Sequence, residues 1–81
     1  MPAKGVRLGY VKTKLQQAIL DAIGDRSVYQ AASDWELPHW VLVDTLRGKV
    51  DCPSPKYLRQ VARGLGWSVE DVIDAAYAVP A

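Results

Sequence analysis

Apolar residues recur at spacings of three and four along most of this chain, and serine, proline or glycine interrupts the pattern at short intervals. Such spacing gathers apolar side chains on one face of an α-helix, and the interruptions are typical of helix caps and stops. The strand-like run Trp40–Val43 is short and is flanked by helical spacing. We therefore predict an all-α fold, a compact domain of five short helices around one core.

The five expected helices follow from these caps, stops and stripes. They cover residues 12–23, 27–35, 38–47 and 54–65, and a fifth begins at 68. Serines 27, 54 and 68 are the expected caps, Pro38 and Pro55 suit first turns, and glycines 24, 48, 64 and 66 are the expected stops. The inward-facing residues are expected to be Leu15, Ala18, Ile19, Ala22, Ile23, Ala31, Ala32, Trp35, Leu42, Leu46, Leu58, Val61, Ala62, Leu65, Trp67, Val69, Val72, Ile73 and Ala76.

Composition excludes several classes of function. Among 81 residues, one cysteine and one histidine leave neither a disulfide framework nor a usual metal site, and we expect no metal and no cofactor. Cys52 and His39 have no recognisable triad partners in the sequence, and the chain contains no glycine-rich phosphate loop. We therefore do not expect an enzyme or a small-molecule substrate. Without an apolar run long enough for a membrane span or a signal peptide, we expect no membrane association and a cytoplasmic location.

Charge alternates along the chain although the net charge is only +1. Residues 1–26 and 47–66 are basic, whereas residues 27–46 and 67–81 are acidic. If the fold brings the two basic zones together, they form one basic face. The other interpretation is four solvated surfaces with no common target.

Residues 27–49, SVYQAASDWELPHWVLVDTLRGK, meet the demands of two short helices joined by a tight turn. Ser27 caps the first helix, and Ala32 is small where the second helix crosses it. Leu37 is an apolar plug just after the turn, and Leu42 and Leu46 point back to the core. These features predict a helix-turn-helix, whose second helix lies in the major groove of DNA.

This segment resembles the lambda-repressor-like helix-turn-helix family of Cro and phage repressors. The likeness continues through Arg47-Gly48-Lys49, residues 54–66 and residues 68–72, which resemble the end of the third helix, the fourth helix and the start of the fifth. The resemblance implies a sequence-specific transcriptional regulator that binds double-stranded operator DNA. At this length we expect a minimal Cro-type repressor, with a domain at residues 12–78, a flexible basic arm at 1–11 and a frayed tail at 79–81.

One departure from the family lies in the turn, where Glu36 stands at a position that often holds glycine because its φ tends to be positive. A non-glycine residue with positive φ costs roughly 1–2 kcal/mol. We therefore expect that the turn can be rearranged here.

The resemblance assigns four residues of the third helix to the base-facing side: His39, Trp40, Val43 and Asp44. Trp40 and Val43 suit thymine methyl groups, and Asp44 suits the N4 amino group of cytosine. The alternatives are a polar surface role for His39, burial of Trp40 by a tilted helix, an incidental surface valine at position 43, and an Asp44 that repels phosphate or pairs with an arginine. Arginine, asparagine and glutamine are absent from this helix until Arg47.

A second group of residues is expected at the phosphate backbone, as this docking mode implies: Ser27, Gln30, Arg47, Lys49, Lys56 and Tyr57. Simple solvation is the alternative for the basic side chains, and packing on Pro53 or Pro55 is the alternative for Tyr57. The basic arm, with Lys4 and Arg7, is expected to reach the minor groove or to be a loose terminus.

Two further expectations concern partners. The competing function is an antitoxin or a protein-interaction adaptor whose acidic, aromatic third helix has exchanged DNA for a protein. The second expectation concerns self-association. In the fifth helix, Val69, Val72, Ile73 and Ala76 are expected to pack against the core of their own domain. Tyr77, Val79 and Pro80 then remain, a patch below the roughly 800 Å² per partner of a stable interface. We therefore expect a monomer or a weak homodimer that is completed on DNA.

Overall fold

The computed structural model describes residues 11–79, which contain five α-helices and no strand. The helices are α1 (Lys14–Ile23), α2 (Val28–Asp34), α3 (His39–Leu46), α4 (Pro55–Leu65) and α5 (Val69–Ala76). The prediction of an all-α fold with five short helices is confirmed. Residues 1–10 of the expected arm and residues 80–81 of the expected tail lie outside the described part of the chain.

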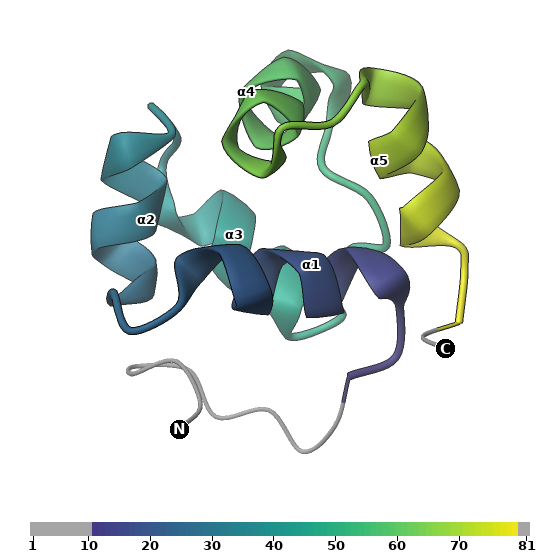
Figure 1. The fold of residues 1–81 in the computed structure, drawn as a ribbon, viewed down its shortest axis with the longest axis horizontal. Helices are drawn as coiled ribbons and strands as arrows, with labels where there is room; N and C mark the ends of the chain where they lie inside the picture. The colour runs from purple at the N-terminus through teal and green to yellow at the C-terminus, as the bar shows by residue number, and fades with distance from the viewer. Residues whose placement is uncertain (1–10, 80–81) are drawn as a thin grey trace.

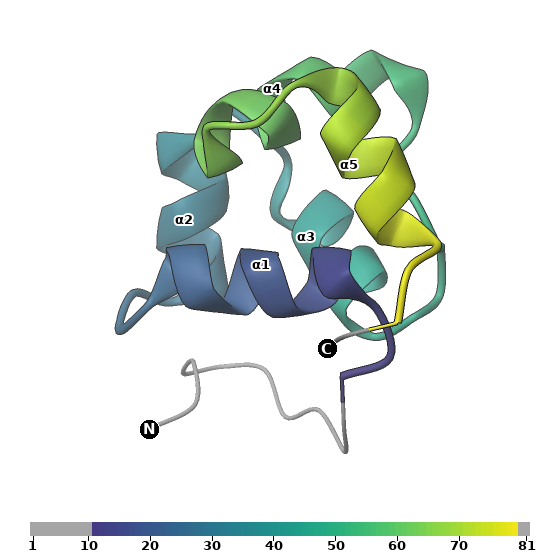
Figure 2. The same ribbon diagram turned by 45° about the vertical axis from the view of Figure 1, so that its right-hand side comes forward.

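The helices enclose one core, with α2 and α5 at opposite ends of α1 and α4 on the other side of the core (Figures 1 and 2). α2 packs against α3, α4 packs against α5, and α1 contacts α3, α4 and α5. Each helix contributes apolar side chains to the core, which consists of Leu15, Ile19, Ile23, Val28, Ala31, Ala32, Leu37, Val41, Leu42, Leu46, Leu58, Val61, Ala62, Val72, Ala75 and Ala76. The core therefore holds all five helices in one domain.

Side-chain caps begin three of the helices. The hydroxyl of Ser27 accepts a hydrogen bond from the backbone N–H of Gln30 at 3.0 Å, as predicted. Capping boxes begin α5, between Ser68 and Asp71, and α1, where Thr13 was not singled out in the sequence. The prediction that Ser54 caps α4 is wrong in one respect, because its side chain makes no cap hydrogen bond.

Three helices end in the same way, with a residue of positive φ followed by two backbone hydrogen bonds that return to the last turn. Gly48 and Gly66 occupy this position after α3 and α4, with φ of 77° and 72°. Glu36 occupies it after α2, with φ of 60°. Its N–H donates to the Ser33 carbonyl at 3.1 Å, and the Leu37 N–H donates to the Ala32 carbonyl at 2.8 Å. The turn is thus not rearranged, and the backbone bonds hold Glu36 in the glycine-like conformation.

Gly64 does not close α4, contrary to the prediction, because it lies within the helix. A Cβ built on it would lie 2.3 Å from Cδ2 of Trp35. The absence of a side chain therefore lets the indole of α2's C-cap residue pack directly on α4. Trp35 and Trp67 are half-buried against the core, not within it as predicted.

The apolar face of α5 also differs from the prediction. Ala75 is buried, whereas Ile73 is 38% exposed and does not belong to the core. One helix of eight residues can turn only about a third of its surface inward, and Val72, Ala75 and Ala76 take that arc. Ile73 therefore joins the exposed Tyr77 and Val79 on the outside of the domain.

Candidate nucleic-acid interface

Four exposed or half-buried rings from three helices form two contacting pairs, which we together call the aromatic strip: Tyr29 with His39, and Trp40 with Tyr57. The rings of Tyr29 in α2 and His39 in α3 lie 4.5 Å apart between centroids, tilted by 33°. The rings of Trp40 in α3 and Tyr57 in α4 meet edge to face at 5.6 Å. His39 and Trp40 are the first two residues of α3, so they connect the two pairs. Through these two pairs, the N-terminal end of α3 contacts α2 on one side and α4 on the other.

The predicted base-facing residues do not all lie in the same environment. His39 is exposed and Trp40 is 49% exposed, so the alternative in which a tilted helix buries Trp40 does not hold. Val43 is half-buried and packs against the core, which corrects its assignment as a fully outward side chain. Asp44 is half-buried, and its carboxylate makes no ion pair or hydrogen bond among residues 11–79. The pairing of Asp44 with a neighbouring arginine is therefore not observed.

Helix periodicity explains this division of α3. The buried residues Val41, Leu42, Thr45 and Leu46 occupy one side of the helix. His39, Trp40, Val43 and Asp44 fall on the other side, where Val43 and Asp44 are half-buried. The hydroxyl of Thr45 donates to the Val41 carbonyl at 2.8 Å, so this polar side chain is satisfied within the core.

The basic side chains predicted at phosphates surround the end of α3 and the start of α4. Arg47, Lys49 and Lys56 are exposed, and none forms an ion pair among the described residues. The ammonium of Lys56 lies 5.5 Å from the centroid of the Tyr57 ring, which joins it to the aromatic strip. Tyr57 is half-buried against the core and contacts Trp40, two contacts that the sequence analysis did not predict.

The loop after α3 is folded back on the helix. The N–H of Lys49 donates to the Asp44 carbonyl at 2.9 Å, and the N–H of Gly48 donates to the Thr45 carbonyl at 3.2 Å. These bonds hold the backbone of Arg47 and Lys49 beside the C-terminal turn of α3. The two side chains are thus carried by an ordered turn.

Gln30 has a different environment from the one predicted. Its side-chain amide donates to Asp34 Oδ1 at 2.9 Å, and Arg26 donates to the other carboxylate oxygen at 2.8 Å. The hydrogen bond from Gln30, followed by that from Arg26, lowers the pKa of the Asp34 carboxyl. Arg26 also donates to the carbonyls of Ala22 and Ile23, so it joins the end of α1 to α2. The amide of Gln30 is thus engaged within the protein.

A buried glutamine fixes the other end of α3. Gln16 of α1 donates to the carbonyls of Thr45 and Leu46 at 3.0 and 3.3 Å. Its side-chain oxygen accepts from the N–H groups of Lys12 and Thr13 at 2.7 and 3.1 Å. Both donors and the acceptor are therefore used, and the last turn of α3 is bonded to the first turn of α1. The sequence signal was a polar residue beside the stripe, which an exposed position would equally explain.

No protein-family model, curated protein or solved structure was found to match this chain. The residues of the molecule itself therefore carry the functional argument.

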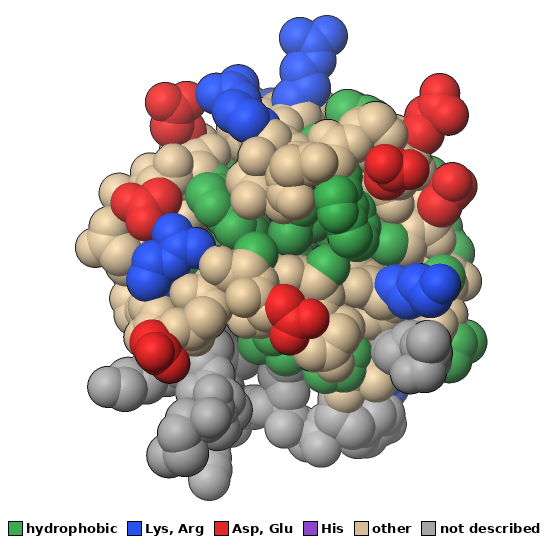
Figure 3. All heavy atoms as spheres, in the orientation of Figure 1, with side chains coloured by type: hydrophobic (Ala, Val, Ile, Leu, Met, Phe, Trp, Pro, Cys, Tyr) green, Lys and Arg blue, Asp and Glu red, His purple; other side chains and the backbone are tan. Residues whose placement is uncertain are grey.

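Charged side chains are unevenly distributed on the surface. On the face drawn in Figure 3, acidic side chains gather on the side of α5 and basic ones project above α4, while further acidic and basic side chains lie on the side of α2. Apolar side chains show between them, over the seam of α1, α4 and α5. α5 carries Glu70, Asp71 and Asp74 and no basic residue. This side is unsuited to a polyanion.

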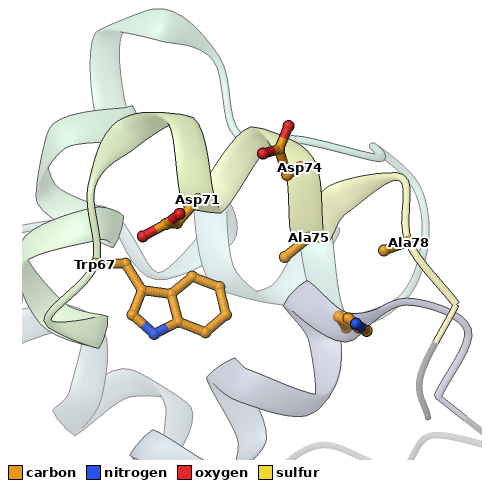
Figure 4. Close-up of a pocket in the computed structure, with 6 residues that line it drawn as sticks. Trp67, Asp71, Asp74, Ala75 and Ala78 are labelled. Carbon is orange, nitrogen blue, oxygen red and sulfur yellow. The ribbon is translucent and has the colours of Figure 1, made fainter.

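Two hollows lie away from α3. One, of about 270 Å³, is lined by Lys14, Trp67, Asp71, Asp74, Ala75 and Ala78. Figure 4 shows the Trp67 ring between α5 and α1, with the Asp74 carboxylate turned away from it. The other, of about 290 Å³, is lined by Asp34, Trp35, Glu36, Gln60, Arg63 and Gly64. Neither hollow brings together a nucleophile and a base.

Three further observations on residues 11–79 concern metal ligands, the one thiol and helix length. No group of three or more potential metal ligands occurs there. Burial, followed by the charge of Asp51, raises the pKa of the Cys52 thiol, which disfavours the nucleophilic thiolate. No described helix is long and apolar enough to cross a membrane.

Proposed function

We propose that this protein binds double-stranded DNA through α3 and regulates transcription, as a small repressor of the Cro type. One observation carries the proposal. α3 presents exposed His39 and Trp40 on its outer side. Arg47 and Lys49 follow its last turn, and Lys56 of α4 lies beside Tyr57, whose ring contacts Trp40. None of these three basic side chains has an ion pair within residues 11–79. A helix that reads base edges between phosphate-binding cations has this organisation.

The connection between α2 and α3 supports the same proposal. A reading helix needs a short turn and a fixed crossing, and here the positive φ of Glu36, the buried Leu37 and the small Ala32 supply both. The Cro-like arrangement and the major-groove docking are parts of this proposal, as are the roles of the named side chains.

Salt dependence of binding tests the proposal. Each phosphate neutralised contributes about −0.9 to the slope of log affinity against log salt. We expect wild-type protein to bind random-sequence duplexes with a slope of several such increments. The double substitution Arg47→Gln with Lys49→Gln should reduce it by about two increments. Arg59→Gln with Arg63→Gln, on the exposed side of α4, makes the same change in charge and should leave the slope nearly unchanged.

The exposed Trp40 also favours a second candidate, a module that docks on another protein. If α3 instead docks on a protein through Trp40, the affinity of this protein for duplex DNA should depend little on salt. If wild-type protein binds no duplex, the DNA-binding proposal is wrong. If both double variants change the slope equally, the assignment of the DNA interface to α3 is wrong.

A further inference from the structure

The outer side of α3 has an unusual chemical composition for a helix proposed to read bases. Its outward side chains offer an indole, an imidazole and a carboxylate, and the helix contains no arginine, lysine, asparagine or glutamine. Guanine and adenine are commonly read through N7 by such donors. α3 itself is therefore poorly equipped for purines.

Trp40 and Asp44 lie one helical turn apart, at positions i and i+4, so their side chains are neighbours about 6 Å apart at Cβ. Trp40 is 49% exposed, and its ring is braced from one side by the edge contact with Tyr57. The Asp44 carboxylate has no partner within residues 11–79. Together they present an apolar surface beside a free hydrogen-bond acceptor.

The base edge that complements this pair can be identified from its atoms. A carboxylate accepts from an amino group and is repelled by a neighbouring acceptor, which adenine has at N7 and thymine has at O4. Cytosine offers its N4 amino group with no acceptor of its own beside it in the major groove. An indole surface gains from a methyl group, and the pyrimidine methyl is attached to C5, next to the carbon that carries N4 in cytosine.

We propose that α3 reads a cytosine N4 amino group through Asp44 together with a pyrimidine C5-methyl group through Trp40. This inference rests on the proposed DNA-binding function. 5-Methylcytosine carries both groups on one base, whereas a thymine beside an unmodified cytosine supplies them from two bases. Both sources offer a C5-methyl group near an N4 amino group. They can be distinguished because the methyl is removed by replacing 5-methylcytosine with cytosine in the first case and thymine with uracil in the second.

Binding selection with modified duplexes tests this inference. Random duplexes made with cytosine or with 5-methylcytosine are selected on the full chain, and the enriched duplexes are measured by fluorescence anisotropy. Burial of one methyl contributes about 0.8 kcal/mol, which is about fourfold in affinity. We expect 5-methylcytosine at one enriched position to raise affinity by about this factor. If the methyl comes from a thymine, replacing that thymine by uracil lowers affinity by the same factor, and methylating cytosine changes nothing.

Variants of the two residues connect either effect to α3. Trp40→Ala should abolish the methyl effect and Trp40→Phe should retain part of it, because the position is exposed and a ring is kept. Asp44→Asn should relax the cytosine preference, whereas Asp51→Asn makes the same charge change in the following loop and should preserve it. Circular dichroism checks that each variant keeps its helices.

The outcomes separate this inference from the function on which it rests. If the protein binds duplexes with a phosphate-type salt slope but neither methyl substitution changes affinity, or the effect survives Trp40→Ala, the methyl inference is overturned and the DNA-binding proposal stands. If Asp44→Asn tightens binding to every sequence equally, Asp44 is a repulsive group and the cytosine assignment is overturned. If no duplex is bound, both proposals fail.

Discussion

Gln16 offers the sharpest test of how α3 is held, because one buried side chain makes four hydrogen bonds: two to carbonyls at the end of α3 and two from N–H groups just before α1. We predict that Gln16→Met, which keeps a similar length and volume, destabilises the domain mainly through the loss of these bonds. Gln17→Met is the matched control one residue along. Gln17 is exposed and donates only to Asp21 at 2.9 Å.

The expected magnitude follows from what each partner retains. The Thr45 carbonyl also accepts from the Gly48 N–H at 3.2 Å, whereas the Leu46 carbonyl depends on Gln16. An unsatisfied buried carbonyl costs about 1–3 kcal/mol, and the partly exposed N–H groups of Lys12 and Thr13 can bond to water at a smaller loss. We expect a total loss of about 3 kcal/mol in the free energy of unfolding. In a domain of this size, that lowers the melting temperature by roughly 10–25 °C.

Urea and thermal denaturation followed by circular dichroism measure both variants. Gln17→Met should stay within about 0.5 kcal/mol of wild type, as exposed substitutions usually do. A Gln16→Met variant equally close to wild type would refute the reasoning, since it would show that water or relaxation replaces all four bonds.

Gln16→Glu adds a pH dependence to the same test. The carboxylate oxygens would face the carbonyls of Thr45 and Leu46 where the amide now donates, which favours the protonated acid and raises its folded-state pKa. The folded state then binds more protons than the unfolded state above the ordinary glutamate pKa of about 4.3. We therefore expect this variant to be most stable below that pH and to lose stability as the pH rises through the raised pKa. A stability difference from wild type that does not change with pH would contradict this.

Four further predictions follow from other contacts. Gly64→Ala should lower the free energy of unfolding by about 1–3 kcal/mol because its methyl collides with Trp35, and in a Trp35→Ala background the same substitution should stabilise the helix. Glu36→Gly should raise the melting temperature, with a gain of about 1 kcal/mol from relief of the positive φ; no gain would mean that the turn is unstrained. Because the pKa of Asp34 is lowered in the folded state, its carboxylate stabilises the domain above the ordinary aspartate pKa of about 3.9. This contribution is lost as the pH falls through the lowered pKa. The free energies of unfolding of wild type and Asp34→Asn should therefore converge in acid. Sedimentation at micromolar concentration should find a monomer or weak dimer without DNA and a dimer with it; a tight dimer without DNA would implicate the exposed apolar side of α5.

Helix positions were predictable because they depend on local chemistry that the sequence displays. Ser27 and Ser68 cap helices through their own hydroxyls, and the apolar stripe of residues 15–23 needs only the helical period to be recognised. The conformation of Glu36 was harder to predict, because a positive φ at a non-glycine residue is unfavourable unless the backbone hydrogen bonds of the turn offset it. Side-chain type alone predicted strain there, and the two return bonds of the turn kept the conformation.

The contacts between helices were not predictable in the same way. Nothing local in the sequence shows that Gly64 accommodates Trp35, because the two residues are far apart in the chain and the contact depends on where α2 meets α4. The hydrogen bonds from Gln16 to α3 were missed for the same reason, because in the sequence Gln16 is only a polar residue beside an apolar stripe. The pairing of Tyr29 with His39 was missed for the same reason, because it requires the crossing of α2 and α3 to be known.

The way α3 is held has a consequence for how recognition could change without loss of the fold. Its buried side carries Val41, Leu42, Thr45 and Leu46, and its last turn is bonded to Gln16 and to the following loop. These contacts use the core side and the backbone, so Asp44 contributes little to holding the helix in place and Trp40 contributes only its edge contact with Tyr57. Substitutions at the two outward positions should therefore alter binding at nearly constant stability, whereas a change at Gln16 moves the whole reading surface. Under the proposed function, base preference and fold stability reside on opposite sides of one short helix.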